Sequence, residues 1–254
     1  MSSNPKTKKQ LWRKLIIILA CVLLVGLIGF SGYFLYSYYN SLPANQDSYR
    51  NASNMEDVKL VEKTNYYELL PKQPGKVGLI LYPGAFAEPK AYLSPFAGLA
   101  QRGVTIFIIK SPLNFALLNP DAAKPIIQSE KHIDQWYVAG HSLGGVTACE
   151  FSKSNQNLIR GLVLLGSYCN GNATKLNIPV LSIFATNDGL TATADIEKSR
   201  LTLPPNSVFV EVAGGNHTQF GSFAKLQPGD HSADVSEQAQ AEQVSKAILN
   251  FINR

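Results

Sequence analysis

Short apolar runs alternate with amphipathic stretches along the chain after residue 54. Several runs, such as 104–109, are β-branched and free of polar residues, which is typical of strands in a parallel sheet covered on both faces. The stretches between them place apolar residues at helical spacing. This alternation predicts an α/β domain, with a mostly parallel sheet and helices on both faces. The expected strands are 58–62, 66–70, 77–82, 104–109, 136–139, 159–165, 179–185 and 208–212, and the expected helices are 91–102, 122–131, 146–153, 192–200 and 237–252.

A different pattern lies near the N-terminus, where residues 15–36 contain no charge at all. This run is long enough to cross a hydrocarbon core of about 30 Å as a helix. A cleavable signal peptide has a shorter apolar core, of about 7–15 residues, followed by a cleavage site. Cys21 resembles a lipoprotein signal only faintly, because the apolar run continues well past it. The run ends in aromatic residues typical of a membrane interface, and it therefore predicts a single-pass transmembrane helix: Tyr33, Phe34, Tyr36, Tyr38 and Tyr39.

The charge distribution gives this helix a direction. Five Lys and Arg residues precede it, and no acidic residue occurs before Asp47. Without these five, 18 Lys and Arg residues stand against 18 Asp and Glu residues, so the rest of the chain is formally neutral. The positive-inside rule therefore predicts a cytoplasmic tail at 1–14 and an extracytoplasmic remainder. The basic excess gives no support for binding to nucleic acid.

Residues 37–54 are mostly polar, so we expect a linker there and a folded domain at 55–254. That length can bury one sizeable core. The only cysteines outside the apolar run are Cys149 and Cys169, so one disulfide is arithmetically possible. We expect instead that Cys149 packs as a small apolar residue on its helix.

A Gly-x-Ser-x-Gly motif joins the expected strand 136–139 to the expected helix 146–153. By itself such a motif arises by accident in roughly one chain in ten of this length. Between a strand and a helix, however, it predicts a nucleophile elbow with Ser142 on a sharp, strained turn. Side chains at Gly140 and Gly144 would clash where the two elements cross. The Leu143 amide would lie at the helix N-terminus, where developing negative charge is stabilised.

Two other expected strands are followed by loops that contain Asp188 and His217. Loops at the carboxyl ends of strands converge on the ligand in an α/β sheet. The order Ser142, Asp188, His217 is that of α/β-hydrolases. We expect His217 to accept the serine proton, and Asp188 to orient the imidazole and stabilise its charged form. Asp195 is the alternative acid.

The other histidines fit this role less well. His132 precedes a strand, and His231 lies in a later loop. His141 is adjacent to the serine, and we expect its side chain on the other side of the turn.

The loop after strand 77–82 is expected to supply the second oxyanion donor, the Ala85 amide, with the Phe86 amide as the alternative. Only a loop separates strands 159–165 and 179–185, so no lid domain is expected and the site should be open.

We expect neither a metal nor a cofactor, because the sequence has no metal-ligand spacing and no nucleotide-binding fingerprint. The expected walls of the site are loop residues that form a shallow apolar groove: Phe86, Asn114, Phe115 and Phe220.

Residues 77–251 resemble the α/β-hydrolase superfamily, in its membrane-anchored or secreted branch, with a distant similarity to dienelactone hydrolases and carboxylesterases. True dienelactone hydrolases use a cysteine nucleophile, so Ser142 argues against that substrate. The resemblance implies the α/β-hydrolase fold and ester hydrolysis. It rests on the segments Tyr82-Pro83-Gly84-Ala85, Ser111-Pro112-Leu113-Asn114, Gly140-His141-Ser142-Leu143-Gly144-Gly145, Asn187-Asp188-Gly189 and Gly215-Asn216-His217-Thr218-Gln219-Phe220-Gly221.

We therefore expect a membrane-anchored, extracytoplasmic serine hydrolase that cleaves small-molecule carboxylic esters through an acyl-enzyme. Two alternatives stay open. The acyl-enzyme could pass its acyl group to an alcohol, which would make the protein an acyltransferase on envelope glycans or lipids. The fold could also serve a binding domain without turnover. Without a lid to displace, short-chain soluble esters should be cleaved with no activation by a lipid interface.

Overall fold

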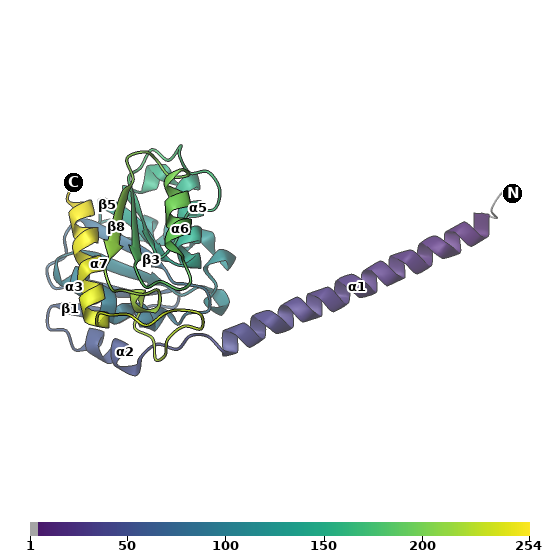
Figure 1. The fold of residues 1–254 in the computed structure, drawn as a ribbon, viewed down its shortest axis with the longest axis horizontal. Coiled ribbons are helices and arrows are strands. Elements are labelled where there is room, and N and C mark those ends of the chain that lie inside the picture. The colour runs from purple at the N-terminus through teal and green to yellow at the C-terminus, as the bar shows by residue number, and fades with distance from the viewer. Residues whose placement is uncertain (1–4) are drawn as a thin grey trace. The chain divides into compact units, whose positions relative to one another are not determined.

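The computed structural model describes residues 5–254, with side chains from residue 9 onward (Figure 1). The chain divides into two compact units, Met1–Asn40 and Ser41–Arg254.

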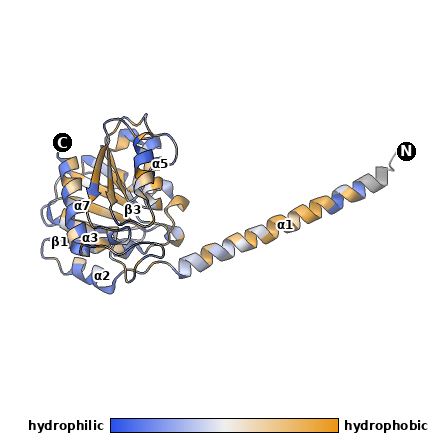
Figure 2. Ribbon diagram, in the orientation of Figure 1, coloured by the Kyte–Doolittle hydropathy of each residue, from blue (hydrophilic) through white to orange (hydrophobic). Residues whose placement is uncertain are grey.

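The first unit is a single helix, α1 (Pro5–Tyr39). Its part Lys9–Tyr39 is long and apolar enough to cross a membrane, and none of its most apolar window is buried inside the structure. Apolar residues occupy the middle of α1 on all sides (Figure 2). A helix that is hydrophobic all round belongs either in a protein core or in a bilayer. The helix is therefore a candidate transmembrane span, as its sequence predicts.

The second unit is built on one eight-stranded sheet with the order β1-β2-β4-β3-β5-β6-β7-β8. The first two strands are antiparallel additions at one edge, and all pairs from β4 onward are parallel. Each expected strand is present, with ends within two residues of those predicted. The strands are β1 (Val58–Glu62), β2 (Tyr66–Pro71), β3 (Val77–Tyr82), β4 (Thr105–Ile109), β5 (Gln135–His141), β6 (Gly161–Leu165), β7 (Val180–Ala185) and β8 (Val208–Val212).

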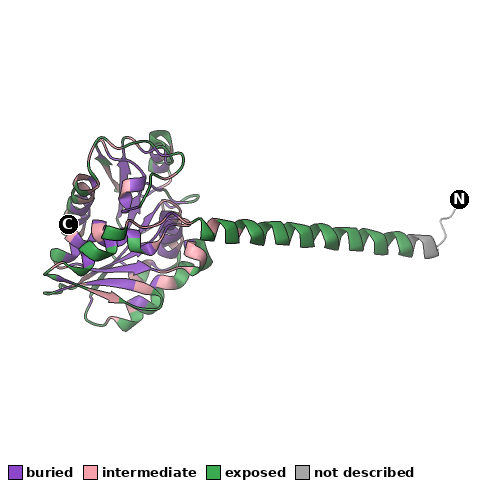
Figure 3. Ribbon diagram, turned by 90° about the horizontal axis from the view of Figure 1, so that it is seen from below, coloured by how far each residue is buried: buried purple, intermediate pink, exposed green. Residues whose placement is uncertain are grey.

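Helices cover both faces of this sheet, so the predicted α/β architecture is confirmed. On one face, α3 (Leu93–Gln101) and α7 (Glu237–Ile252) share a core with Leu79 and Leu81 of β3. On the other face, α4 (Ala123–Ser129) and α5 (Leu143–Ser154) share a core with Ile80 of the same strand. The inner strands are buried, whereas the edge strands β1 and β8 and the outer helix surfaces are partly exposed (Figure 3). Each fully buried Leu or Ile contributes about 1.5–3 kcal/mol.

The loop between β6 and β7 contains no helix or strand, so no lid domain is inserted at this point of the chain. After β7 the chain forms α6 (Thr193–Arg200) and then β8.

The polar stretch before β1 differs from the expected linker. The compact unit begins at Ser41, and residues 46–53 form a helix, α2 (Gln46–Ser53), capped by the Asn45 side chain. Residues 41–45, which we call the strap, pair with loops of the domain through isolated β-bridges at Leu42 and Ala44. Main-chain hydrogen bonds hold the strap, and these depend little on side-chain polarity. Composition therefore gave no sign of this structure.

The two cysteines also differ from expectation, because Cys149 and Cys169 form a disulfide with a Cα–Cα distance of 5.5 Å. The bond joins α5 to the loop after β6. The parallel pairing of β5 with β6 brings these two segments together, although 20 positions separate the cysteines in the sequence.

Candidate active site

Ser142 occupies a turn between the end of β5 and the start of α5, as the elbow motif predicts. Its backbone has φ 52° and ψ −128°, in the left-handed half of the map that side chains disfavour. A Cβ at Gly140 would overlap the Gly144 carbonyl, and a Cβ at Gly144 would overlap the Tyr82 carbonyl. The strand and helix can cross this closely only because both positions are glycine.

Strained backbone conformations also occur in the loops next to this turn. Four non-glycine residues have positive φ in the part of the chain that the structure describes: Phe86, Leu113, Asn114 and Ser142. All four lie in loops that follow the carboxyl ends of β3, β4 and β5. Such conformations cost about 1–3 kcal/mol each and tend to cluster at functional sites.

Asp188 and His217 form a buried pair, with 2.8 Å between Oδ2 and Nδ1 and with side chains 1% and 0% exposed. The other carboxylate oxygen of Asp188 accepts hydrogen bonds from the Leu190 and Thr191 amides. This pairing keeps the proton of a neutral His217 on Nδ1 and leaves Nε2 as the acceptor. Nε2 is buried and has no hydrogen-bond partner among the described residues.

The alternative acid lies elsewhere. Asp195 is on α6, where its half-exposed carboxylate is 3.5 Å from Lys198 Nζ. The structure thus brings Asp188, and not Asp195, to His217.

His141 connects the base to the elbow. It precedes Ser142 directly, and its ring centroid is 4.5 Å from that of His217. The Gly84 amide donates to the Tyr92 hydroxyl, which lies 2.8 Å from His141 Nδ1. Burial, together with the neighbouring His217, lowers the pKa of His141 well below its usual range, so this ring is neutral. We expected the His141 side chain on the far side of the turn; it packs instead among the catalytic candidates because the turn directs it into the core.

Two amides stand free where an oxyanion could bind. In the loop after β3, the Gly84 amide bonds to Tyr92 and the Phe86 amide donates to the Asn114 carbonyl. The Ala85 amide between them has no hydrogen-bond partner among residues 5–254. The Leu143 amide is in the first turn of α5, where no helical acceptor precedes it. This favours Ala85 and Leu143 as donors and removes Phe86 as the alternative.

A second buried carboxylate, Asp230, ties the acid loop to the base loop, and sequence reasoning missed it. One oxygen accepts from the amides of Gly189, His217 and His231, at 2.9, 3.4 and 2.9 Å. The other accepts from the amide and the hydroxyl of Thr218, at 2.7 and 2.6 Å. Burial raises the pKa of Asp230, but these hydrogen bonds outweigh it and hold the pKa below its usual value. The preceding residues, Pro228-Gly229, indicate an ordinary turn, so the sequence gives no sign that Asp230 has a special role.

The four expected wall residues separate into two groups. Phe86 and Phe115 stack with ring centroids 5.2 Å apart, and both are partly exposed. The Asn114 side chain beside them donates to the Ser41 hydroxyl of the strap, at 3.3 Å. Phe220 is buried and packs against His141 and His217, at 5.4 and 6.5 Å between ring centroids. Phe220 thus packs against the histidine rings, whereas Phe86 and Phe115 form a separate, partly exposed pair.

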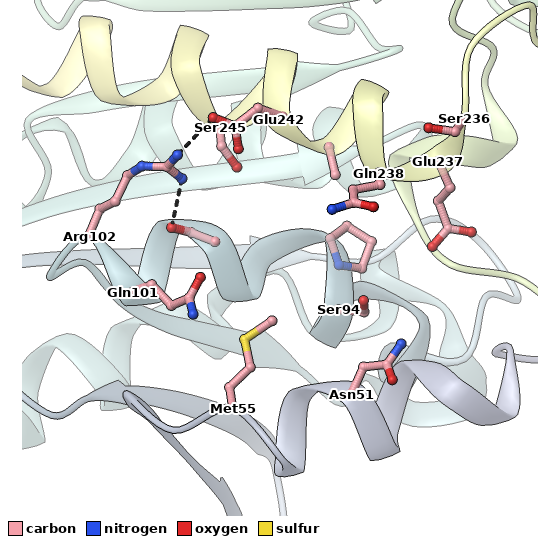
Figure 4. A pocket seen from close by; sticks show the side chains of 13 residues that line it. Asn51, Met55, Ser94, Gln101, Arg102, Ser236, Glu237, Gln238, Glu242 and Ser245 are labelled. Atoms are coloured by element: carbon pink, nitrogen blue, oxygen red, sulfur yellow. Dashed lines mark hydrogen bonds and ion pairs between the residues drawn. The ribbon is translucent and has the colours of Figure 1, made fainter.

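A cavity of about 620 Å³ lies on another part of the domain, between α2, α3 and α7 (Figure 4). Arg102 reaches across it to Glu242, at 2.7 Å, and to the Gly98 carbonyl. Its lining is mostly polar and includes none of the candidate catalytic residues. In the part of the chain that the structure describes, no group of three or more His, Cys, Asp or Glu residues could hold a metal ion.

The fold, the elbow and the buried acid–base pair define an α/β-hydrolase. The chain belongs to the alpha/beta hydrolase family, whose model matches residues 78–242.

Solved structures of similar fold include a Paleococcus ferrophilus monoacylglycerol lipase (13% identity, TM-score 0.58, covering 76% of this chain and 98% of that one). A Mycobacterium tuberculosis esterase is similar at 13% identity and TM-score 0.57, covering 80% and 95%. Mouse alpha/beta hydrolase domain-containing protein 10 follows at 10% identity and TM-score 0.55, covering 77% and 98%. No curated protein matches the sequence.

Proposed function

We propose that the protein is a serine hydrolase of carboxylic esters, with Ser142 as nucleophile, His217 as general base and Asp188 as the acid that orients the imidazole. The observation that carries this proposal is the buried Asp188–His217 pair beside the strained Ser142 turn. Esterases and lipases among proteins of similar fold support it further.

The geometry supports the following steps. Ser142 Oγ attacks the ester carbonyl, while its proton passes to the free Nε2 of His217. Asp188 stabilises the imidazolium that forms, and the neutral His141 ring adds no opposing charge. His217 then gives the proton to the departing alcohol, which leaves an acyl-enzyme. Water attacks the acyl-enzyme in the same way and releases the acid.

The Leu143 and Ala85 amides would stabilise the tetrahedral oxyanion in both halves of the reaction. Loss of one such donor costs about 10²- to 10³-fold in kcat in well-studied enzymes.

The membrane helix and the disulfide together support an extracytoplasmic catalytic domain. The basic tail before α1 favours a cytoplasmic N-terminus under the positive-inside rule. The Cys149–Cys169 disulfide belongs to an oxidising compartment, outside the cytoplasm. A cleaved signal peptide would agree with the disulfide but would release the domain. N-terminal sequencing of the mature protein tests this point, because a retained Lys9–Tyr39 segment is required for anchoring.

The central experiment is labelling of the purified full chain with a fluorophosphonate probe, alongside hydrolysis of p-nitrophenyl butyrate. Wild-type protein should be labelled at Ser142, and the Ser142→Ala variant should neither be labelled nor hydrolyse the ester. A folded wild-type protein that shows neither property would be a binding domain without turnover. Addition of acceptor alcohols tests the acyltransferase alternative, since transfer gives a new ester in place of the free acid.

A further inference from the structure

The strap braces the catalytic loops from both sides of the site. The Leu42 amide donates to the Phe86 carbonyl at 2.7 Å, and the Glu88 amide donates to the Leu42 carbonyl at 3.1 Å. On the opposite side, the Asn45 amide donates to the Ser222 carbonyl at 2.9 Å, in the loop that follows His217. The strap therefore joins the oxyanion loop to the histidine loop.

The connection between α1 and the strap is very short. Only Asn40 separates Tyr39, the last residue of α1, from Ser41. Three residues of fully extended chain span at most about 11 Å, so Leu42 lies within that distance of the helix end, whatever the orientation of the two units. Very little chain therefore separates the end of α1 from the strap that holds the loops of the candidate site.

Most of the exposed large apolar side chains of Ser41–Arg254 lie on loops at the carboxyl end of the sheet. Seven large apolar side chains of Ser41–Arg254 are exposed, and five of them lie on loops that follow the carboxyl ends of β4, β6, β7 and β8. The five, which we call the apolar rim, are Leu117, Leu118, Tyr168, Leu190 and Leu226. The other two are Tyr49 on α2 and Leu201 after α6. The shared place of the apolar rim at one end of the sheet makes these loops a candidate interaction surface.

We propose that the apolar rim rests in the surface of the bilayer that holds α1, and that the enzyme hydrolyses esters whose acyl chains lie in that membrane. This inference rests on the proposed hydrolase function and on α1 as a membrane anchor. Amphipathic surfaces bind bilayer interfaces in proportion to the apolar area that they bury. The short connection keeps the rim at a high effective concentration near the membrane. A site without a lid then receives lipid esters directly, and it still accepts soluble short-chain esters.

The test uses the full chain reconstituted in phosphatidylcholine vesicles that contain p-nitrophenyl palmitate. Soluble p-nitrophenyl acetate serves as the second substrate, and the ratio of the two rates is the readout. One variant carries about 20 Gly and Ser residues inserted between Asn40 and Ser41, a flexible spacer with a reach of about 25 Å. Another carries Leu117→Ser with Leu118→Ser. Leu201→Ser is the control, at a leucine that follows α6, is not part of the rim and is more exposed (83%) than Leu117 (40%) and Leu118 (49%).

The insertion and the rim variant should each lower the palmitate-to-acetate ratio about fivefold or more, and Leu201→Ser should keep the wild-type ratio. Hydrolysis of acetate in every variant shows that the domain is folded and active. If both test variants keep the wild-type ratio, the membrane inference is overturned and the hydrolase function stands. If wild-type protein cleaves neither ester, the proposed function itself fails.

Discussion

The acid–base side of the candidate site and its nucleophile side differ in how many of their polar groups are already bonded. On the acid–base side, Asp188 and Asp230 accept hydrogen bonds on both carboxylate oxygens, and the backbone and Nδ1 of His217 are held. On the nucleophile side, the amides of Ala85 and Leu143 have no partner within residues 5–254. This difference in hydrogen bonding agrees with the roles proposed for the two sides. The groups that move a proton need fixed geometry, whereas the donors must wait for an oxyanion that exists only during the reaction.

Removal of the nucleophile should have the largest effect, because both half-reactions pass through Ser142. We expect Ser142→Ala to lower kcat on p-nitrophenyl butyrate by about 10³-fold or more, with little change in Tm. His217→Ala should behave alike. Ser154→Ala, in an exposed position at the end of α5, is the control and should retain wild-type rates. Substantial turnover in Ser142→Ala would place the nucleophile elsewhere.

Asp188→Asn tests the carboxylate that pairs with His217. The amide would favour the wrong tautomer of His217, so we expect a loss in kcat of roughly 10²- to 10⁴-fold, at most equal to that of Ser142→Ala. Asp195→Asn is the matched control, since Asp195 pairs only with Lys198 on the surface of α6. Steady-state rates for the two variants decide between the acids. A dead Asp195→Asn beside an active Asp188→Asn would reverse the assignment.

Asp230→Asn asks whether the hydrogen-bond network around His217 matters for its position. The amide nitrogen would face backbone donors, and a displacement of about 1 Å can cost up to about 10²-fold, so we expect kcat to fall by about 10- to 100-fold with a smaller change in KM. Asp57→Asn, on the surface beside Lys72 and far from the site in sequence, serves as control. A purely structural role would lower Tm and leave the rate per folded molecule unchanged.

The pKa of Asp230 adds a stability measurement to this test. Its pKa in the folded state lies below the unfolded value of about 3.9, so its contribution is fully present above that pH and is lost as pH falls through the folded pKa. Melting curves between pH 6 and pH 2 should therefore show a smaller acid-induced fall in Tm for Asp230→Asn than for the wild type. Equal falls in the two proteins would show that Asp230 does not couple to stability.

The disulfide should have the smallest effect on catalysis, because it joins α5 to the loop after β6 and includes none of the candidate catalytic residues. We expect Cys169→Ser to lower the free energy of unfolding by about 2–4 kcal/mol, with activity at room temperature changed by less than about threefold. Denaturant unfolding with and without reductant measures this. A wild-type protein whose unfolding is insensitive to reductant would argue against the bond.

Periodicity predicted the strands well, because each buried run has to alternate with a helix that covers it. The order of Ser142, Asp188 and His217 was equally visible, since each residue follows its own strand. Asp230 was missed, because its role depends on backbone amides brought together by two loops. The strap and the disulfide were missed for the same reason: their partners are distant in the sequence, and their own residue types carry no periodic signal.

The strap also bears on how easily a protease could separate the domain from α1. Proteases cleave extended, unpaired chain, which is most common at loop tips and tails. From Leu42 to Ser53 the backbone is bridged to the domain or helical, and α1 is helical up to Tyr39. Asn40 and Ser41 are held as well, since the Asn40 amide donates to the Tyr36 carbonyl and the Ser41 hydroxyl accepts from the Asn114 side chain. With α1 retained as the proposed anchor, proteolytic release of the domain should therefore be slow.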